Sequence, residues 1–217
     1  MNTFERPFGY FWSLLAALPL SCPAATLCFS PLCGTKGLEG WAFEAGVAMI
    51  TQSDIGDFAL GSVNQANGPA GGEVYSFTAS RRLGELQWKI GGHTFTPQLE
   101  IPLTLELVNE NGSTVFPTYN ASFAVRWVDF PWNEYVKTSF SMGIGLSYSQ
   151  EIYQVDRDRH EGEDRSYLKF NWPIQLSLAL PRFEKDQLTI FIAHHSGGHI
   201  FDVGGFNSLG VGYRHEL

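Results

Sequence analysis

From about residue 40 onward, apolar residues alternate with small or polar ones, and convincing helical spacing is scarce. A period of two is the pattern of a β-strand with one apolar face. The stretch from Val136 to Tyr148 alternates along its whole length. Eight segments of this kind are predicted as strands: 41–51, 72–82, 86–109, 114–128, 135–151, 166–180, 187–197 and 207–217. We expect the third strand to be bent or broken around Gly91 and Gly92.

An even number of strands with alternating faces is typical of a closed antiparallel barrel, whose tilted strands need about 9–11 residues to cross a membrane. The predicted fold is therefore all-β, an eight-stranded antiparallel outer-membrane β-barrel. The connections support it, because such barrels have short periplasmic turns and longer external loops. We expect short turns at 82–85, 130–134 and 181–186 and long loops at 52–71 and 152–165, with the short external connection 110–113 as the exception.

Composition and charge narrow the class of protein further. The chain of 217 residues has the length of one domain, and its hydrophobic content of 44% is ordinary for a soluble protein. A barrel is expected to look this way, because only every second strand residue faces lipid. The net charge of −8, without a cluster of Lys or Arg, argues against a nucleic-acid partner.

An export signal is predicted at the N-terminus, where Arg6 precedes an apolar run at 11–20 and several small residues. A lipoprotein site at Cys22 is the alternative, which Pro19 disfavours because a branched aliphatic residue is expected three positions before the cysteine. The predicted organisation is a signal peptide at 1–25, cleaved near Ala24 or Ala25, an N-terminal periplasmic segment at 26–40 and a β-barrel domain at 41–217.

The last two predicted strands bring a histidine and a serine onto one face. The even positions from Leu188 to Ile192 are apolar, and His194 and Ser196 continue their face. In the final strand the odd positions are apolar, so Asn207 begins the same outward stripe. A serine becomes a nucleophile when a base takes its proton. With both termini periplasmic, these residues lie in the outer leaflet, which is lipopolysaccharide in Gram-negative bacteria, and they predict an enzyme that acts on lipid.

The run His194-His195-Ser196-Gly197-Gly198, followed by Gly205-Phe206-Asn207, resembles the PagL-type lipid A 3-O-deacylases, a family of acyloxyacyl hydrolases. Supporting segments lie upstream: Arg126-Trp127, Phe130-Pro131-Trp132-Asn133, Gly143 to Tyr148, and Trp172 to Pro181. The resemblance covers roughly residues 95–217. It implies an outer-membrane barrel of a Gram-negative bacterium that removes the ester-linked acyl chain at the 3-position of lipid A and needs no cofactor.

Carried over position by position, the resemblance implies Ser196 as the nucleophile and His194 as the general base. A glutamate in the best-known members falls at or beside Asn207, which can accept a hydrogen bond from the imidazole but cannot stabilise the imidazolium. Gly197 replaces an asparagine that commonly follows the serine. Backbone N–H groups of Gly197 or Gly198 would then bind the oxyanion.

Several neighbouring residues have roles that the sequence leaves open. Asp202 is an alternative acid for the histidine, and a dyad assisted by water is a further arrangement. His195 is expected to point into the barrel and join an internal polar network. A metal site built on His199 is disfavoured because no ligand spacing is regular, so no metal is expected. In an oxidising periplasm Cys28 and Cys33 can form a small disulfide.

The charged run 156–165 is expected to be a solvated external loop, and contact with lipid A phosphates or divalent cations is the alternative. The expected partners are lipopolysaccharide or lipid A as substrate and the outer membrane itself, and a homodimer is left open. Two other interpretations compete with the esterase. One is a non-catalytic eight-stranded barrel with a structural or loop-mediated interaction role. The other is a secreted soluble barrel that binds a lipid in its lumen.

Overall fold

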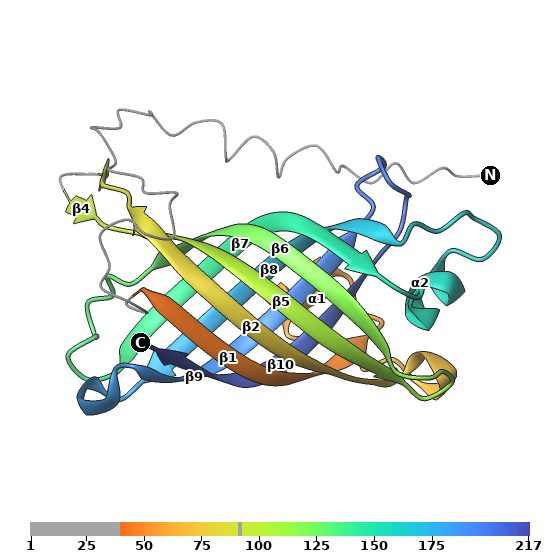
Figure 1. Ribbon diagram of the computed structural model, residues 1–217, viewed down its shortest axis with the longest axis horizontal. Coiled ribbons are helices and arrows are strands. Elements are labelled where there is room, and N and C mark those ends of the chain that lie inside the picture. The colour runs from red at the N-terminus through yellow and green to blue at the C-terminus, as the bar shows by residue number, and fades with distance from the viewer. Residues whose placement is uncertain (1–39, 91–92) are drawn as a thin grey trace.

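The computed structural model describes residues 40–90 and 93–217, which form a closed barrel of eight antiparallel strands (Figure 1). Each strand pairs with its neighbours in sequence, and the last strand closes the barrel against the first. The barrel strands are β1 (Trp41–Thr51), β2 (Gly72–Glu85), β5 (Gln98–Glu110), β6 (Phe116–Trp127), β7 (Lys137–Ser149), β8 (Leu168–Ala179), β9 (Asp186–Ser196) and β10 (Gly205–Glu216). The predicted eight-stranded barrel is confirmed.

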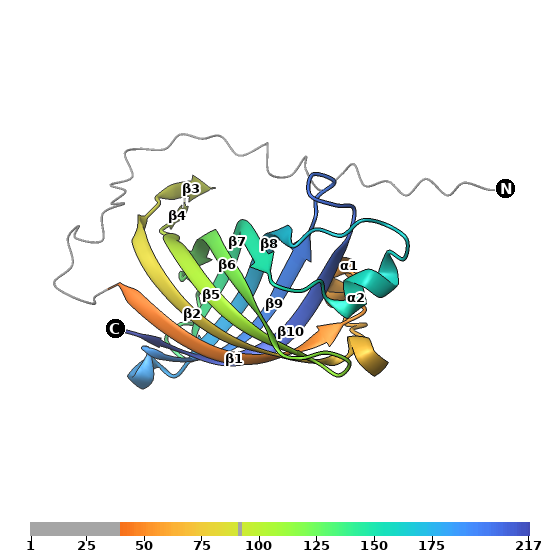
Figure 2. The same ribbon diagram turned by 45° about the vertical axis from the view of Figure 1, so that its right-hand side comes forward.

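Short helices and a small hairpin occupy the two ends of the barrel (Figures 1 and 2). Helices α1 (Ile55–Leu60), η1 (Gly68–Ala70) and α2 (Gln154–Arg159) belong to the two long loops at one end. The hairpin of β3 (Trp88–Ile90) and β4 (His93–Phe95), helix η2 (Pro181–Phe183) and the C-terminus lie at the other. No helix within 40–90 and 93–217 is long and apolar enough to span a membrane.

The barrel is apolar outside and polar inside, as strand alternation requires. The outward positions of every strand carry exposed aliphatic and aromatic side chains. Examples, one from each strand in order, are Phe43, Phe77, Leu105, Phe123, Ile144, Leu178, Ile190 and Val211. An exposed apolar surface that circles a barrel is the surface that lipid covers.

A network of charged and amide side chains fills the middle of the lumen. Glu100 of β5 binds Arg126 of β6 at 3.0 Å and Arg214 of β10 at 2.9 Å, and all three side chains are 3% exposed. Gln175 donates to Glu44, also buried, and accepts from Arg126. A cavity of about 70 Å³ remains between these groups. The network spans the lumen from β1 to β8, as expected of a barrel this small.

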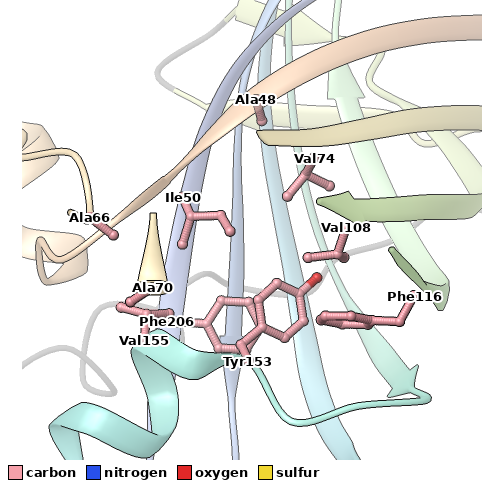
Figure 3. Packing of buried hydrophobic residues seen from close by; sticks show 10 residues of the cluster. All are labelled: Ala48, Ile50, Ala66, Ala70, Val74, Val108, Phe116, Tyr153, Val155 and Phe206. Carbon is pink, nitrogen blue, oxygen red and sulfur yellow. The ribbon is translucent and has the colours of Figure 1, made fainter. Parts of the chain in front are cut away.

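An apolar cluster closes the barrel beneath α2 (Figure 3). Tyr153, at the start of α2, stacks on Phe206 of β10 at 3.9 Å and meets Phe116 of β6 edge-on at 5.3 Å. The remaining members come from β1, β2, β5 and the loops: Ala48, Ile50, Ala66, Ala70, Val74, Val108 and Val155. The loops at this end therefore pack into the barrel mouth and hold the rim in a defined position.

The third predicted strand is wrong in part, and so is the turn before it. Strand β2 continues through 82–85, where a bulge precedes Gly84, and pairs with β5 as far as Glu85 and Gln98. The alternating residues that begin the predicted strand 86–109 instead pair with each other in the β3–β4 hairpin. Local alternation does not reveal the partner of a strand. The predicted signal peptide, residues 26–39 of the predicted periplasmic segment 26–40, and all three cysteines lie outside the described residues.

Candidate functional site

The predicted register of the last two strands is confirmed. Along β9 the even positions are at least partly exposed, whereas the odd ones, apart from the half-buried Phe191, are buried. His194 and Ser196 lie on the outward side of β9, and Asn207 lies directly across from His194 in the β9–β10 ladder. They belong to the last residues of β9 and the first residues of β10, and these strand ends lie at the end of the barrel that carries α1 and α2 (Figure 2).

A chain of two hydrogen bonds fixes the state of His194. The amide nitrogen of Asn207 donates to the backbone carbonyl of Ser53 at 2.7 Å, which turns its Oδ1 toward His194. Nδ1 of His194 lies 2.7 Å from that oxygen and must carry the proton that is donated. In the neutral ring Nε2 is then unprotonated. Nε2 can therefore accept a proton, although the partner of Nδ1 is an amide oxygen and not a carboxylate.

Ser53 is held in place by its own loop. Its hydroxyl accepts a hydrogen bond from the backbone N–H of Asn64 at 2.8 Å and donates to the carbonyl of Ser62 at 3.4 Å. This segment lies against the outward side of β10, so Asn207 is only 2% exposed although its strand position faces outward. Because water cannot compete for its amide, Asn207 keeps a single hydrogen-bond pattern.

The side chain of Ser196 faces outward, and two glycines follow it in the sequence. The N–H of Gly198 donates to the Ser196 hydroxyl at 3.2 Å, whereas the N–H of Gly197 is bonded to the carbonyl of Gly204 at 2.8 Å. Of the two predicted oxyanion donors, only Gly198 is directed at the serine. Gly198 has a φ of +60°, and a Cβ atom there would lie 2.8 Å from the ring of Phe170. A glycine is therefore required at this turn.

Aromatic rings surround the histidine and the serine. Trp172 of β8 pairs with His194 across the ladder, and its ring meets the imidazole edge-on at 6.0 Å. Phe170 pairs with Ser196 and lies 5.0 Å from the ring of Phe201 in the loop after β9. These rings restrict the imidazole and supply an apolar surface next to the hydroxyl, of the kind that an acyl chain would contact.

His194 and Ser196 share no hydrogen bond within the described part of the chain. Residues two apart on a strand are roughly 6.5–7 Å apart. Because catalytic hydrogen bonds are often long before substrate binds, this spacing is compatible with proton transfer once the hydroxyl and the ring turn toward each other.

Asp202 is not placed to serve as the acid. Its carboxylate binds Lys169 of β8 at 2.5 Å and Arg165 at 3.2 Å, and both cations also bind the fully buried Asp156. Burial would raise the pKa of Asp202, but hydrogen bonds from Lys169 and from the N–H groups of Ser166 and Gly204 outweigh it, so the pKa lies below its usual value. The four charges lock the loop after β9 to the loop after β7.

Two further expectations need correction. The run 156–165 is not simply a solvated loop, because its residues Asp156 and Arg165 belong to the buried cluster. His195 does point into the barrel, but its ring lies 4.8 Å from Phe206 and 6.3 Å from Tyr153, beside that stacked pair, and neither of its ring nitrogens has a hydrogen-bond partner in the described structure. Apolar packing of the mouth, rather than a polar network, surrounds this histidine.

Among residues 40–90 and 93–217, no group of three or more His, Cys, Asp or Glu side chains is placed to hold a metal ion. The groups that hydrogen bonds join at the candidate site belong to Ser53, His194, Ser196, Gly198 and Asn207. Sequence reasoning missed Ser53, which contributes a backbone carbonyl and so has no side-chain signature.

Comparison with known proteins bears on the fold. No protein-family model matches the sequence, and no curated protein matches it. Among solved structures, the outer membrane enzyme PagL superposes with a TM-score of 0.55 and 13% identity over 81% of this chain and 99% of that chain. Neisserial surface protein A gives 0.45 and 14% over 84% and 100%, and the Yersinia pestis outer membrane protein Ail 0.31 and 14% over 80% and 99%. The chain shares the eight-stranded barrel architecture of PagL.

Proposed function

We propose that this chain is an outer-membrane esterase of a Gram-negative bacterium that removes an ester-linked acyl chain, the 3-O chain, from lipid A. Ser196 is the nucleophile, His194 the general base and Asn207 the residue that orients the base. The observation that carries the proposal is the hydrogen-bond chain from Ser53 through Asn207 to His194, because it sets the tautomer that a serine hydrolase needs.

The position of the site supports a lipid substrate. His194 and Ser196 continue an outward row of apolar residues on β9, so a molecule reaching them would come from the surrounding membrane. The site lies at the end of the barrel that carries the longest loops, which is the external end in barrels of this architecture. Lipid in that leaflet of a Gram-negative outer membrane is lipopolysaccharide, whose acyl esters are the chemical group that a serine hydrolase attacks.

The proposed reaction has two steps, acylation of Ser196 and hydrolysis of the acyl-serine. Ser196 Oγ forms a bond to the ester carbonyl carbon while Nε2 of His194 takes the hydroxyl proton. The bond to the sugar oxygen then breaks, and that oxygen leaves as an alcohol with the proton from His194. Water attacks the carbonyl carbon of the acyl-serine while His194 takes one of its protons. The bond from that carbon to Oγ then breaks, Oγ regains the proton from His194, and the fatty acid leaves. The Gly198 N–H is the backbone donor available to the developing oxyanion.

Mass spectrometry of lipid A from cells expressing the protein tests this function. We expect the wild type to remove an acyl chain and Ser196→Ala to leave lipid A intact. Ser208→Ala is the matched control, because Ser208 lies on β10 near the same depth but points into the lumen. It should retain full activity.

The other outcomes separate the alternatives. Loss of the acyl chain with both wild type and Ser196→Ala contradicts the serine mechanism. An unchanged lipid A with folded wild-type protein in the outer membrane contradicts the esterase and favours the non-catalytic barrel. Detergent-free solubility of the folded protein favours the lipid-carrying soluble barrel.

A further inference from the structure

The loop after β1 brings an acidic residue to the candidate site. Asp54 directly follows Ser53, whose carbonyl orients Asn207, and it stands at the N-terminal end of α1. Its backbone N–H is fixed by the carboxylate of Asp57 at 2.9 Å. The peptide unit that joins Ser53 to Asp54 is therefore held at both ends. Its carbonyl binds Asn207, which sets the tautomer of His194, and its N–H binds Asp57.

The proposed mechanism needs a negative charge near His194. When Nε2 takes the serine proton, the imidazole becomes a cation, and the amide of Asn207 stays neutral. In serine hydrolases a carboxylate both orients the histidine and stabilises the imidazolium. Here Asn207 orients the ring, so the stabilising charge has to come from another residue.

The loops at this end bring charged groups near His194 in the described structure. Asp54 shares a peptide unit with the Ser53 carbonyl, Arg159 of α2 reaches Asp54, and His195 is the adjacent residue on β9. Asp54 is also ion-paired with Arg159. Of these groups, only Asp54 carries a negative charge, and Arg159 opposes it.

We propose that Asp54 is a positioning residue that supplies, through space, the negative charge which Asn207 lacks, and that Arg159 tempers this charge. The inference rests on the proposed function. Orientation and charge, which one carboxylate combines in other serine hydrolases, are then divided between β10 and the loop after β1. The side chain of Asp54 is 67% exposed, so its effect on the histidine is weaker than that of a buried carboxylate.

The test is the pH dependence of acyl-chain release from purified lipopolysaccharide in detergent. Asp54→Asn keeps the size of the side chain and a good helix N-cap but removes the charge. We expect turnover to fall about 3-fold and the acid limb of the profile to move down by about 0.5 pH unit, because the protonated histidine loses an attractive charge. Arg159→Gln should move the limb in the opposite direction, and Asp54→Glu should restore the wild-type profile.

Asp158→Asn is the matched control, since it removes one negative charge from α2, where Asp158 accepts a hydrogen bond from Gln154. Its profile should coincide with that of the wild type. A structural role for Asp54 would lower activity without shifting the limb. Coincident profiles for Asp54→Asn and the wild type overturn the proposal, even when Ser196→Ala confirms the esterase.

A second measurement does not depend on turnover. In protein with isotopically labelled histidine, NMR follows the protonation of His194, assigned by comparison with His194→Gln. Asp54→Asn should move the midpoint to lower pH and Arg159→Gln to higher pH. An inactive wild type with these shifts present contradicts the proposed function and retains the electrostatic link, whereas unmoved midpoints overturn the link itself.

Discussion

Asn207 presents its carbonyl oxygen, and not its amino group, to Nδ1 of His194 at 2.7 Å. The orientation is imposed from behind, since the amino group is bound to the carbonyl of Ser53. An asparagine without such a partner can turn its N–H toward the ring and hold the wrong tautomer, which costs a serine protease about 10⁴-fold in turnover. The backbone carbonyl of Ser53 removes that ambiguity.

Replacing Asn207 tests this orienting role. Asn207→Ala should lower kcat about 100-fold or more, because His194 loses the acceptor that fixes Nδ1–H. Asn207→Asp keeps the acceptor, so it should retain more activity than the alanine variant. It should also unfold more readily in urea, because a 2%-exposed carboxylate would face the carbonyl of Ser53. Wild-type kinetics for Asn207→Ala would show that this residue does not orient the base.

A charge on the outward face tests whether lipid covers it. Ile190, in the middle of β9, is 48% exposed in the isolated barrel. Ile190→Arg should lower the free energy of unfolding in phospholipid vesicles by about 2–4 kcal/mol, the cost of an arginine near the bilayer centre. Leu60→Arg, on the exposed surface of α1, is the control and should change stability little. Equal effects of the two variants would argue against a membrane around β9.

The lumen network predicts a large effect at Glu100. Glu100→Gln leaves the guanidinium groups of Arg126 and Arg214 buried without their shared carboxylate, and should destabilise the barrel by about 3–5 kcal/mol in urea unfolding. The control is Glu184→Gln, which removes an exposed ion pair with Lys137 at 3.4 Å and should have almost no effect. A similar midpoint for both variants would mean that the network contributes little.

The charged cluster at the loops predicts an acid transition. The pKa of Asp202 is lower in the folded protein than in the unfolded chain, so its ionised form stabilises the fold at and above the usual carboxylate range. That contribution is lost as the pH falls through the lowered pKa. Pepsin should therefore spare the loop at 152–165 at about pH 4 and begin to cleave it toward about pH 2. In Asp202→Asn this loop should be cleaved throughout the range, and resistance equal to the wild type would contradict the prediction.

Strand number, strand faces and the side of the barrel on which His194 and Ser196 lie could be predicted from the sequence, because alternation is a local property of the chain. The β3–β4 hairpin could not, since alternation does not distinguish pairing with a distant strand from pairing within a hairpin. The burial of Asp156 with Arg165 also could not be predicted from the sequence alone. In the sequence these residues belong to a charged run that is typical of a solvated loop. They become buried only because the loop after β7 packs against the loop after β9.

The contact between Asn207 and the carbonyl of Ser53 crosses the seam where β1 meets β10. The base is thus assembled from the first and the last segments of the barrel to be synthesised, and its tautomer is fixed only after the sheet has closed. Before the barrel closes, the chain has all the side chains of the candidate site but not this contact. In the proposed esterase, completion of the barrel and onset of activity would be a single event, so lipids met before insertion would be spared.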